Sequence, residues 1–377
     1  MIGARNGVIP YPIARQPWGM LIPLFMLVAF GAAVLFSAAG GSMEPYASSH
    51  LVRFSVFFLM ALVISLLPRA LVRLLTYPAY VLILILLVIV EAMGALRGGS
   101  QRWLDLGFMV LQPSELMKPV IVVTLAMFYS SLPIGMVHNW RALVVPGVLI
   151  AMPMGLVLLQ PDLGTSLAIA FGGGVVMLLA GLPLRWFIAA GLAALAAAPL
   201  VFFFALQDYQ RQRIMTMFNT EDDVLGASYH INQSKIAIGS GGIFGKGFNE
   251  GSQSHLQYLP EPHTDFVFAT MAEEWGLVGG LFVLAVFSVI LRWGLTVARA
   301  SRDRFSSLLA AGMSATIFFY IAVNLLMVMG MAPVVGIPLP FMSHGGSSML
   351  TNMICIGALM MVNRWNQNVP KGGLSGH

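Results

Sequence analysis

The chain has little charge and almost no thiol, and both shortages limit what it can be. Only 9% of its 377 residues are Asp, Glu, Lys or Arg, and Cys355 is the single cysteine. One cysteine excludes an intramolecular disulfide, and no pair of His or Cys residues has the spacing of a metal site. The scarcity of charge, with a mean hydropathy of +0.85, excludes an ordinary soluble domain.

The apolar residues, 58% of the chain, are gathered in long runs. About 20 helical residues cross the hydrocarbon core of a bilayer, where backbone groups must be bonded within the helix. We count about ten such runs by this criterion, at residues 19–39, 51–68, 75–96, 113–132, 143–159, 163–181, 185–206, 266–291, 306–330 and 344–363. The sequence therefore predicts an all-α polytopic membrane protein that forms one domain over residues 1–377. A large extracytoplasmic loop, 207–265, would join the seventh and eighth helices, and 365–377 would be a short cytoplasmic tail.

The charged residues are unevenly distributed between the two predicted sides. If the N-terminus is inside, the short outer loops and adjoining helix ends carry only Arg53, Arg97 and Arg102, and the inner loops carry most other cations. An excess of Lys and Arg on the cytoplasmic side orients membrane proteins. Asp303 is the only acidic residue predicted on that side. We therefore expect both termini in the cytoplasm and the chemistry outside, and the net charge of +5 indicates orientation rather than nucleic-acid binding.

The polar, glycine-rich passage from Tyr229 to Phe268 is exceptional in so apolar a chain. Near its end, Asp265 directly precedes an apolar run that starts at Phe266, so it lies at or near a helix N-terminus. One interpretation is a helix N-cap, a position that favours Asp. The other is a general base in a partly dehydrated cleft. The sequence leaves both open.

Several further charges fall inside predicted membrane helices, and the role of Glu91, in the third, is left open. Glu115 and Lys118 lie three residues apart and so share a helix face. An isolated charge at mid-membrane costs roughly 2.5–3.5 kcal/mol on insertion scales. The two residues are either a self-neutralising pair that joins helices or part of the lining of a polar cavity. Glu273 and Glu274 present the same choice, and for these we favour a structural role.

A second glycine-rich feature is the segment 239–247, which reads Gly-Ser-Gly-Gly-Ile-Phe-Gly-Lys-Gly. It lacks both the Walker and the dinucleotide spacings. We interpret it as backbone that a bulky ligand can approach closely, or else as a turn-rich loop. The outer cations could bind phosphate groups, or lipid headgroups instead. They are Arg102, Arg211, Arg213, Lys235 and Lys246.

Motifs across nearly the whole chain resemble those of the SEDS family (shape, elongation, division and sporulation) of membrane glycosyltransferases, and most of all its elongation branch. The first matching motifs are Arg102-Trp103, Gln112-Pro113-Ser114-Glu115 with Lys118, and Gln160 to Ser166. The others are Tyr229-His230-Ile231, Gln233 to Gly242, Leu259-Pro260-Glu261, His263-Thr264-Asp265-Phe266, Gly336 to Phe341 and Gly345 to Ser348. Two positions depart from the family pattern: Ser228 replaces a usual glycine, and His344 a usual tyrosine.

The resemblance implies polymerisation of lipid II into peptidoglycan, with a growing lipid-linked glycan, at the outer face of the bacterial cytoplasmic membrane. It also implies a class B penicillin-binding protein and other elongation-complex proteins as partners. Asp265 would be the catalytic residue. The adjacent cavity would include Glu115, Lys118, Asp162, the outer cations, His263 and Ser347. No cofactor is assigned, and a divalent cation such as Mg²⁺ is a candidate at the pyrophosphate.

We expect an inverting transfer that uses one carboxylate. Lipid pyrophosphate is already a good leaving group, so the second carboxylic acid of glycosidases is not needed. Two other functions remain open. A flippase would also have intramembrane charges and broken helices, but alternating access needs a site near mid-bilayer, and the polar residues here gather at one face. A non-catalytic scaffold for a penicillin-binding protein is the third possibility.

Overall fold

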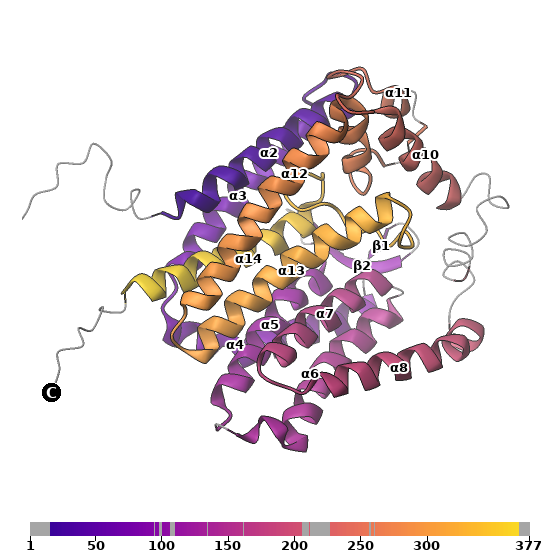
Figure 1. Ribbon diagram of the computed structural model, residues 1–377. Helices are drawn as coiled ribbons and strands as arrows, with labels where there is room; N and C mark the ends of the chain where they lie inside the picture. The colour runs from indigo at the N-terminus through magenta and orange to yellow at the C-terminus, as the bar shows by residue number, and fades with distance from the viewer. Residues whose placement is uncertain are drawn as a thin grey trace, which may run out of the picture.

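The computed structural model describes residues 16–93, 95–97, 100–105, 110–133, 135–160, 162–205, 211, 227–255, 258–259 and 261–368. Within these ranges the long helices run side by side in a bundle (Figure 1). They are α2 (Trp18–Ala38), α3 (Tyr46–Ser65), α4 (Arg69–Met93), α5 (Pro113–Ser131), α6 (Trp140–Leu159), α7 (Leu163–Leu179), α8 (Leu184–Leu200), α12 (Val267–Ala300), α13 (Arg304–Val328) and α14 (Gly346–Asn368). Shorter elements are η1 (Met136–His138), η2 (Val201–Ala205), α10 (Ala227–Ser240) and α11 (Ser252–His255).

Each predicted apolar run corresponds to one long helix, and the all-α polytopic fold class is confirmed. Among the described residues, eight helices are long and apolar enough to cross a membrane, so the number of about ten crossings stays a prediction. Helix α3 begins at Tyr46, whereas the predicted run began at 51. The prediction began late because the first turn of the helix is polar and adds little hydropathy. Helix α14 continues to Asn368, so the first residues of the predicted tail are helical.

The predicted loop 207–265 and the turn before α5 both contain regular structure. Helices α10 and α11 lie within the described part of the loop. A small antiparallel sheet, in the order β1 (Ala95–Arg97), β2 (Ser100–Asp105), β3 (Val110–Leu111), lies between α4 and α5. The sheet was not predicted, because such short strands outside the apolar runs give almost no periodic signal.

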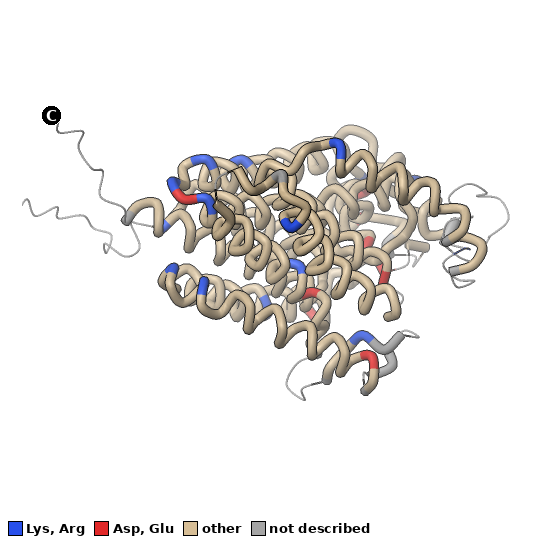
Figure 2. The backbone as a smooth tube through the Cα atoms, turned by 90° about the horizontal axis from the view of Figure 1, so that it is seen from below, with Lys and Arg blue, Asp and Glu red and all other residues tan. Residues whose placement is uncertain are grey.

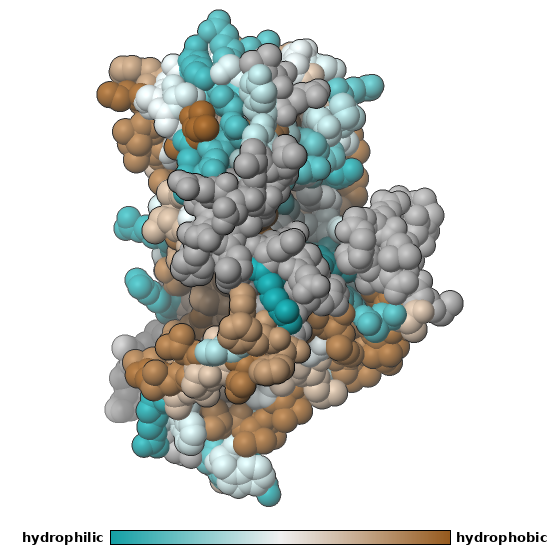
Figure 3. All heavy atoms as spheres, turned by 90° about the vertical axis from the view of Figure 1, so that its right-hand side faces the viewer, coloured by the Kyte–Doolittle hydropathy of each residue, from teal (hydrophilic) through white to brown (hydrophobic). Residues whose placement is uncertain are grey.

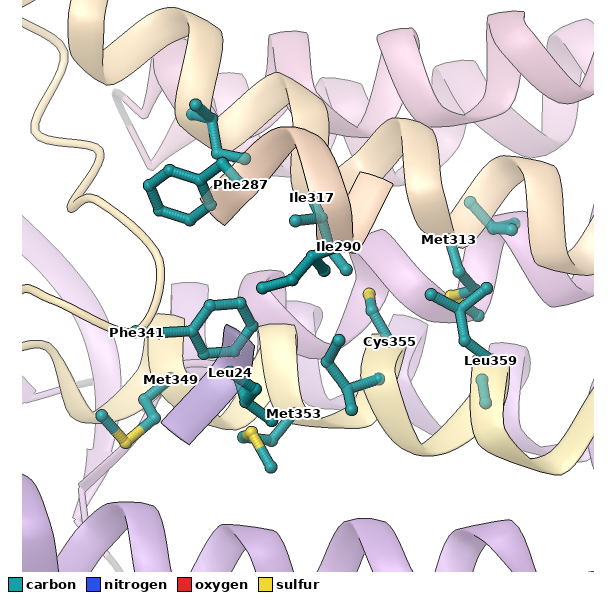
Figure 4. Packing of buried hydrophobic residues seen from close by; sticks show 14 of the residues in the cluster. Leu24, Phe287, Ile290, Met313, Ile317, Phe341, Met349, Met353, Cys355 and Leu359 are labelled. Atoms are coloured by element: carbon teal, nitrogen blue, oxygen red, sulfur yellow. The ribbon is translucent and has the colours of Figure 1, made fainter. Parts of the chain in front are cut away.

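A loop of residues 333–345, which we call the wall loop, is held firmly by the apolar core. The Phe341 side chain extends from it into the core, near Leu24 and Met349 (Figure 4). Helix α2 packs directly on the same loop, because a Cβ at Gly31 would lie 2.7 Å from the Cα of Met342. The wall loop is therefore a fixed surface between α13 and α14.

Helix α12 is broken at Gly276, which has φ +63° and ψ −159°. The segment 241–247, the glycine loop, lies against this break: a Cβ at Gly245 would be 2.0 Å from the carbonyl oxygen of Glu274. Backbone hydrogen bonds join the two, from the Lys246 amide to the Glu273 carbonyl (3.0 Å) and from the Leu277 amide to the Gly242 carbonyl (2.9 Å). The sequence interpretation expected these glycines to allow close approach of a bulky ligand. In the structure, it is the backbone of α12 that approaches them.

Charge and hydropathy are unevenly distributed over the bundle. Several Lys and Arg residues gather at the end of the bundle where α14 ends (Figure 2). There Arg69 and Arg73 contact Asp303 at 3.0 and 3.7 Å. On the face seen in Figure 3, hydrophilic residues gather in the upper part, near α10 and α11, and hydrophobic residues below, near α6 and α8. Helix α8 lies at the edge of the bundle and has no buried residue.

Candidate active site

Asp265 is presented by a turn of residues 261–266 that leads directly into α12. The Thr264 amide bonds to the Glu261 carbonyl at 3.1 Å, and the Thr270 hydroxyl bonds to the Pro262 carbonyl at 3.3 Å. The cap position of α12 is occupied by Phe266, with no side-chain cap hydrogen bond. The N-cap interpretation of Asp265 is therefore wrong, and its half-buried carboxylate lies just before the helix.

The carboxylate of Asp265 faces the wall loop. Its Oδ2 atom lies 3.5 Å from the position that a Cβ would take at Gly336, where φ is +69°. Asn324, on α13, lies behind both segments: its Nδ2 donates to the carbonyl oxygens of Asp265 (2.9 Å) and Ile337 (2.7 Å). The turn and the wall loop are therefore joined at the position of the candidate base.

Next to this turn lies a group that we call the histidine cluster: Tyr46, Arg53, His263 and His344. The His263 ring stacks on Tyr46 with 3.9 Å between centroids, and the His344 amide donates to the His263 carbonyl at 2.8 Å. Arg53 Nη1 lies 3.0 Å from His344 Nε2. Because a guanidinium only donates, Nε2 accepts and the ring proton is on Nδ1. The cluster joins the starts of α3 and α14 to the turn that carries Asp265.

Both histidines of the cluster are held neutral. Burial lowers the pKa of His344, and the neighbouring charge of Arg53 lowers it further. Burial also lowers the pKa of His263, although Glu261, with Oε2 at 3.4 Å from Nε2, opposes this. Arg53 thus remains the permanent positive charge of the cluster.

Glu115 and Lys118 form a closed network inside the bundle. Lys118 Nζ donates to Glu115 Oε1 (2.5 Å) and to the Tyr320 hydroxyl (2.7 Å), which itself donates to Glu115 Oε2. The Thr351 hydroxyl contacts the same carboxylate oxygen at 3.1 Å. Lys118 is only 1% exposed. The pair therefore links α5 to α13 and α14, as the structural interpretation predicts.

Asp162 and Arg102 lie together at the start of α7. Asp162 Oδ1 caps this helix by accepting from the Thr165 amide at 3.0 Å. Its Oδ2 accepts from Gln112 Nε2 at 3.2 Å and lies 3.6 Å from Arg102 Nη1. Arg102 Nε also donates to the Gln160 carbonyl at 2.8 Å. The structure thus brings together two of the predicted cavity residues and joins the starts of α5 and α7.

Lys246 was predicted to lie near a ligand anion, but it is paired within the protein. Its Nζ lies 2.6 Å from Glu273 Oε1 and 2.7 Å from the Ser252 hydroxyl. Glu273 is fully buried and also accepts from the Gln253 amide. This buried carboxylate pairs with the ammonium group, so Lys246 joins the glycine loop to α12, and its predicted contact with a ligand anion stays a prediction.

Three further predicted residues, Lys235, Arg211 and Ser347, are described by the structure. Lys235 is exposed on α10, with its Nζ 2.7 Å from the position of a Cβ at Gly330. Arg211 Nη2 donates to the Phe203 carbonyl at 2.9 Å. Ser347 is half-buried in the first turn of α14. Arg213 lies outside the described residues.

Within the described ranges, no group of three or more His, Cys, Asp or Glu side chains could hold a metal ion. A divalent cation held by one or two carboxylates and the substrate pyrophosphate needs no such cluster, and it stays a prediction. The sequence interpretation also missed Asn324, Tyr46 and the contact between Arg53 and His344. His263, predicted in the cavity, and the departure at His344 were the sequence signals for the histidine cluster.

Known proteins resemble this chain over nearly its whole length. The model of the cell cycle protein family FtsW/RodA/SpoVE matches residues 18–368. Peptidoglycan glycosyltransferase MrdB of Escherichia coli K12 is 42% identical over 357 residues, 93% of this chain and 94% of that protein. The crystal structure of Thermus thermophilus rod shape determining protein RodA is 30% identical, with a TM-score of 0.70, and covers 93% of this chain and 97% of its own.

A second solved chain is from a study of the structural coordination of polymerization and crosslinking by a peptidoglycan synthase complex. It is 30% identical, has a TM-score of 0.81, and the match covers 94% of this chain and 99% of that chain. The resemblance inferred from the sequence motifs is thereby confirmed. The chain belongs to the FtsW/RodA/SpoVE family of cell cycle proteins.

Proposed function

We propose that this protein is a peptidoglycan glycosyltransferase that polymerises lipid II into glycan strands during cell elongation, with Asp265 as its general base. The observation that carries the proposal is the placement of Asp265. It is a half-buried carboxylate on a hydrogen-bonded turn, facing a wall loop that is anchored in the core. The activity named for MrdB, which is 42% identical, supports the same conclusion.

The reaction is a single displacement at the anomeric carbon of the donor. Asp265 takes the proton of the acceptor sugar 4-hydroxyl as its oxygen forms the new glycosidic bond. The bond from the anomeric carbon to the lipid pyrophosphate breaks, and the pyrophosphate leaves with the electron pair. Configuration at that carbon is therefore inverted. A pre-positioned base typically contributes about 10²–10⁴ in rate.

Cations that face the developing pyrophosphate charge would stabilise it. Arg53 is suited to this because its histidine neighbours are neutral and it belongs to the cluster that adjoins the Asp265 turn. Lys118 is less suited, since two of its donors are already used inside the bundle. Arg102 is partly neutralised by Asp162.

The cation-rich end of the bundle lies in the cytoplasm in this proposal, with both termini, and Asp265 faces the exterior of the cytoplasmic membrane. Several Lys and Arg residues at that end support this orientation. A class B penicillin-binding protein is the proposed partner, which would crosslink the strands. The structural match to a chain of a peptidoglycan synthase complex supports such a partner.

The test is reconstitution of the full-length chain with lipid II and its penicillin-binding partner, followed by gel analysis of the glycan products. Wild type is compared with Asp265→Asn, which keeps the size of the side chain but has no base. We expect the variant to accumulate and melt like wild type and to lose most polymerisation. Polymer formed by Asp265→Asn at the wild-type rate would falsify the base assignment.

Two further arms separate the other candidate functions. Glycan strands that form while the partner's transpeptidase serine is blocked would exclude a purely scaffolding role. Liposomes that contain only this chain would show transbilayer movement of labelled lipid II, without polymer, if the protein were a flippase.

A further inference from the structure

We propose that Asn324 is a positioning residue for Asp265. Its side-chain amide holds the turn that carries the carboxylate at a fixed place against the wall loop. This inference rests on the proposed function, because it assigns Asn324 an effect on the rate of the step in which Asp265 acts. Asn324 does not touch the substrate in this scheme: it is fully buried on α13.

The hydrogen bonds of Asn324 join two segments that are far apart in the chain. Nδ2 donates to the carbonyl oxygen of Asp265 at 2.9 Å and to that of Ile337 at 2.7 Å. Both partners only accept, so the orientation of the amide group is fixed, with Nδ2 towards them. One partner belongs to the candidate base itself. The other directly follows Gly336, where a Cβ would lie 3.5 Å from Asp265 Oδ2.

Apolar packing holds the turn and the wall loop together, but it is non-directional. Phe266 and Ile337 are both buried, so each anchors its own segment, the Asp265 turn or the wall loop, in the protein interior. A catalytic group, by contrast, must be held to within about 0.5 Å by hydrogen bonds behind it. Asn324 supplies such directional contacts at the residue that carries the chemistry.

The buried amide oxygen points to the same role. Asn324 Oδ1 has no hydrogen-bond partner among the described residues, although it is buried. An unpartnered buried acceptor disfavours the folded state. Leucine, of similar size, would avoid this cost, so packing alone does not favour an amide here. The two donated hydrogen bonds are what asparagine provides at this position.

The test compares Asn324→Leu and Asn324→Asp with wild type in the reconstituted polymerisation assay, per amount of folded protein. Both variants keep the size of the side chain; Asn324→Leu removes both donors, and Asn324→Asp removes both when ionised and keeps a single O–H donor when protonated. A misplacement of 1 Å can cost about 10²-fold in rate, so we expect kcat to fall roughly 10–100-fold. KM for lipid II should change by less than about threefold, because the lost contact acts on the transition state rather than on binding.

Asn352 provides the matched control. It is the same residue type and equally buried, but its Nδ2 bonds only to Ser348, one turn earlier in its own helix. Asn352→Leu should keep the wild-type kcat. If Asn352→Leu lowers kcat as much as Asn324→Leu does, any buried amide would suffice and the positioning role is overturned.

A double variant tests whether Asn324 acts through Asp265. Asn324→Leu introduced into Asp265→Asn should cause no further loss of the slow residual rate, measured over long incubations. A further loss as large as in the wild-type background would mean that the two residues act independently, and wild-type kcat in both Asn324 variants would overturn the inference directly. Polymer at the wild-type rate from Asp265→Asn would instead overturn the proposed function, so the two failures are distinguishable.

Discussion

Individual charged side chains inside the bundle are mostly paired with an opposite charge, within one helix or between a helix and a loop. Lys118 is paired with Glu115, and Lys246 with Glu273. In a medium of low dielectric constant, loss of one partner leaves a charge that is neither solvated nor paired. Substitutions at these positions should therefore act first on stability.

Lys118→Met should destabilise the folded protein by about 3–5 kcal/mol, because it leaves the Glu115 carboxylate buried without its cation. The measurement is thermal unfolding of the detergent-solubilised protein, together with its yield in membranes. Lys235→Met, at an exposed lysine, is the control and should change stability by about 0.5 kcal/mol or less. Normal melting of Lys118→Met with lost polymerisation would instead favour the cavity role.

Acid should destabilise the histidine cluster. The folded-state pKa values of His344 and His263 are lowered, so the unfolded chain takes up protons first as the pH falls below about 6.5. Stability is therefore fully present above that pH and decreases as the pH falls towards the folded-state pKa values. Melting temperatures between about pH 8 and pH 5 would measure this. In His344→Tyr the slope should be smaller, and an unchanged slope would contradict the assignment.

The candidate base could be found from the sequence, but the residue that holds it could not. Asp265 is conspicuous because it ends a polar passage directly before an apolar run. Asn324 is a single polar residue within an apolar helix, and its partners lie 59 and 13 residues away. No local pattern indicates such a contact, because it exists only once α13 is packed against both segments.

Among the elements, the break in α12 and the glycine loop form one unit. The loop places Gly245 against the Glu274 carbonyl, and hydrogen bonds run in both directions across the contact. The sequence shows the glycines but not what they pack against. They pack against the main chain of α12, which a loop can reach only where the helix is broken. The ten long helices were predictable because each apolar run is long enough to be read without knowledge of its neighbours.

Two glycines of this loop permit a matched comparison. Both have positive φ, but a Cβ would have open space at Gly242 and would meet the Glu274 carbonyl oxygen at 2.0 Å at Gly245. Gly242→Ala should cost about 1–2 kcal/mol of backbone strain. Gly245→Ala should cost about 1–3 kcal/mol more from overpacking. Equal melting temperatures for the two variants would show that the loop does not pack on the break as described.

For the whole molecule, the orientation in the membrane is open to direct measurement. Cys355 is fully buried in α14, so a cysteine introduced at the surface should be the reactive thiol. We expect Glu261→Cys to react with a membrane-impermeant maleimide in right-side-out vesicles. Arg302→Cys, at the cation-rich end, should react only in inverted vesicles. The reverse pattern would place Asp265 on the cytoplasmic side.

The contact between Asn324 and Asp265 also has a consequence for biosynthesis. Membrane helices are synthesised from the N-terminus, and folding follows the order of synthesis. The Asp265 turn is translated before Asn324 and Ile337, its partners in the finished protein. A nascent chain that has just inserted α12 therefore carries its carboxylate without the support that orients it. Catalytic competence arises late, after the ribosome has passed the wall loop, so a prematurely terminated product would remain in the bilayer as an inert fragment.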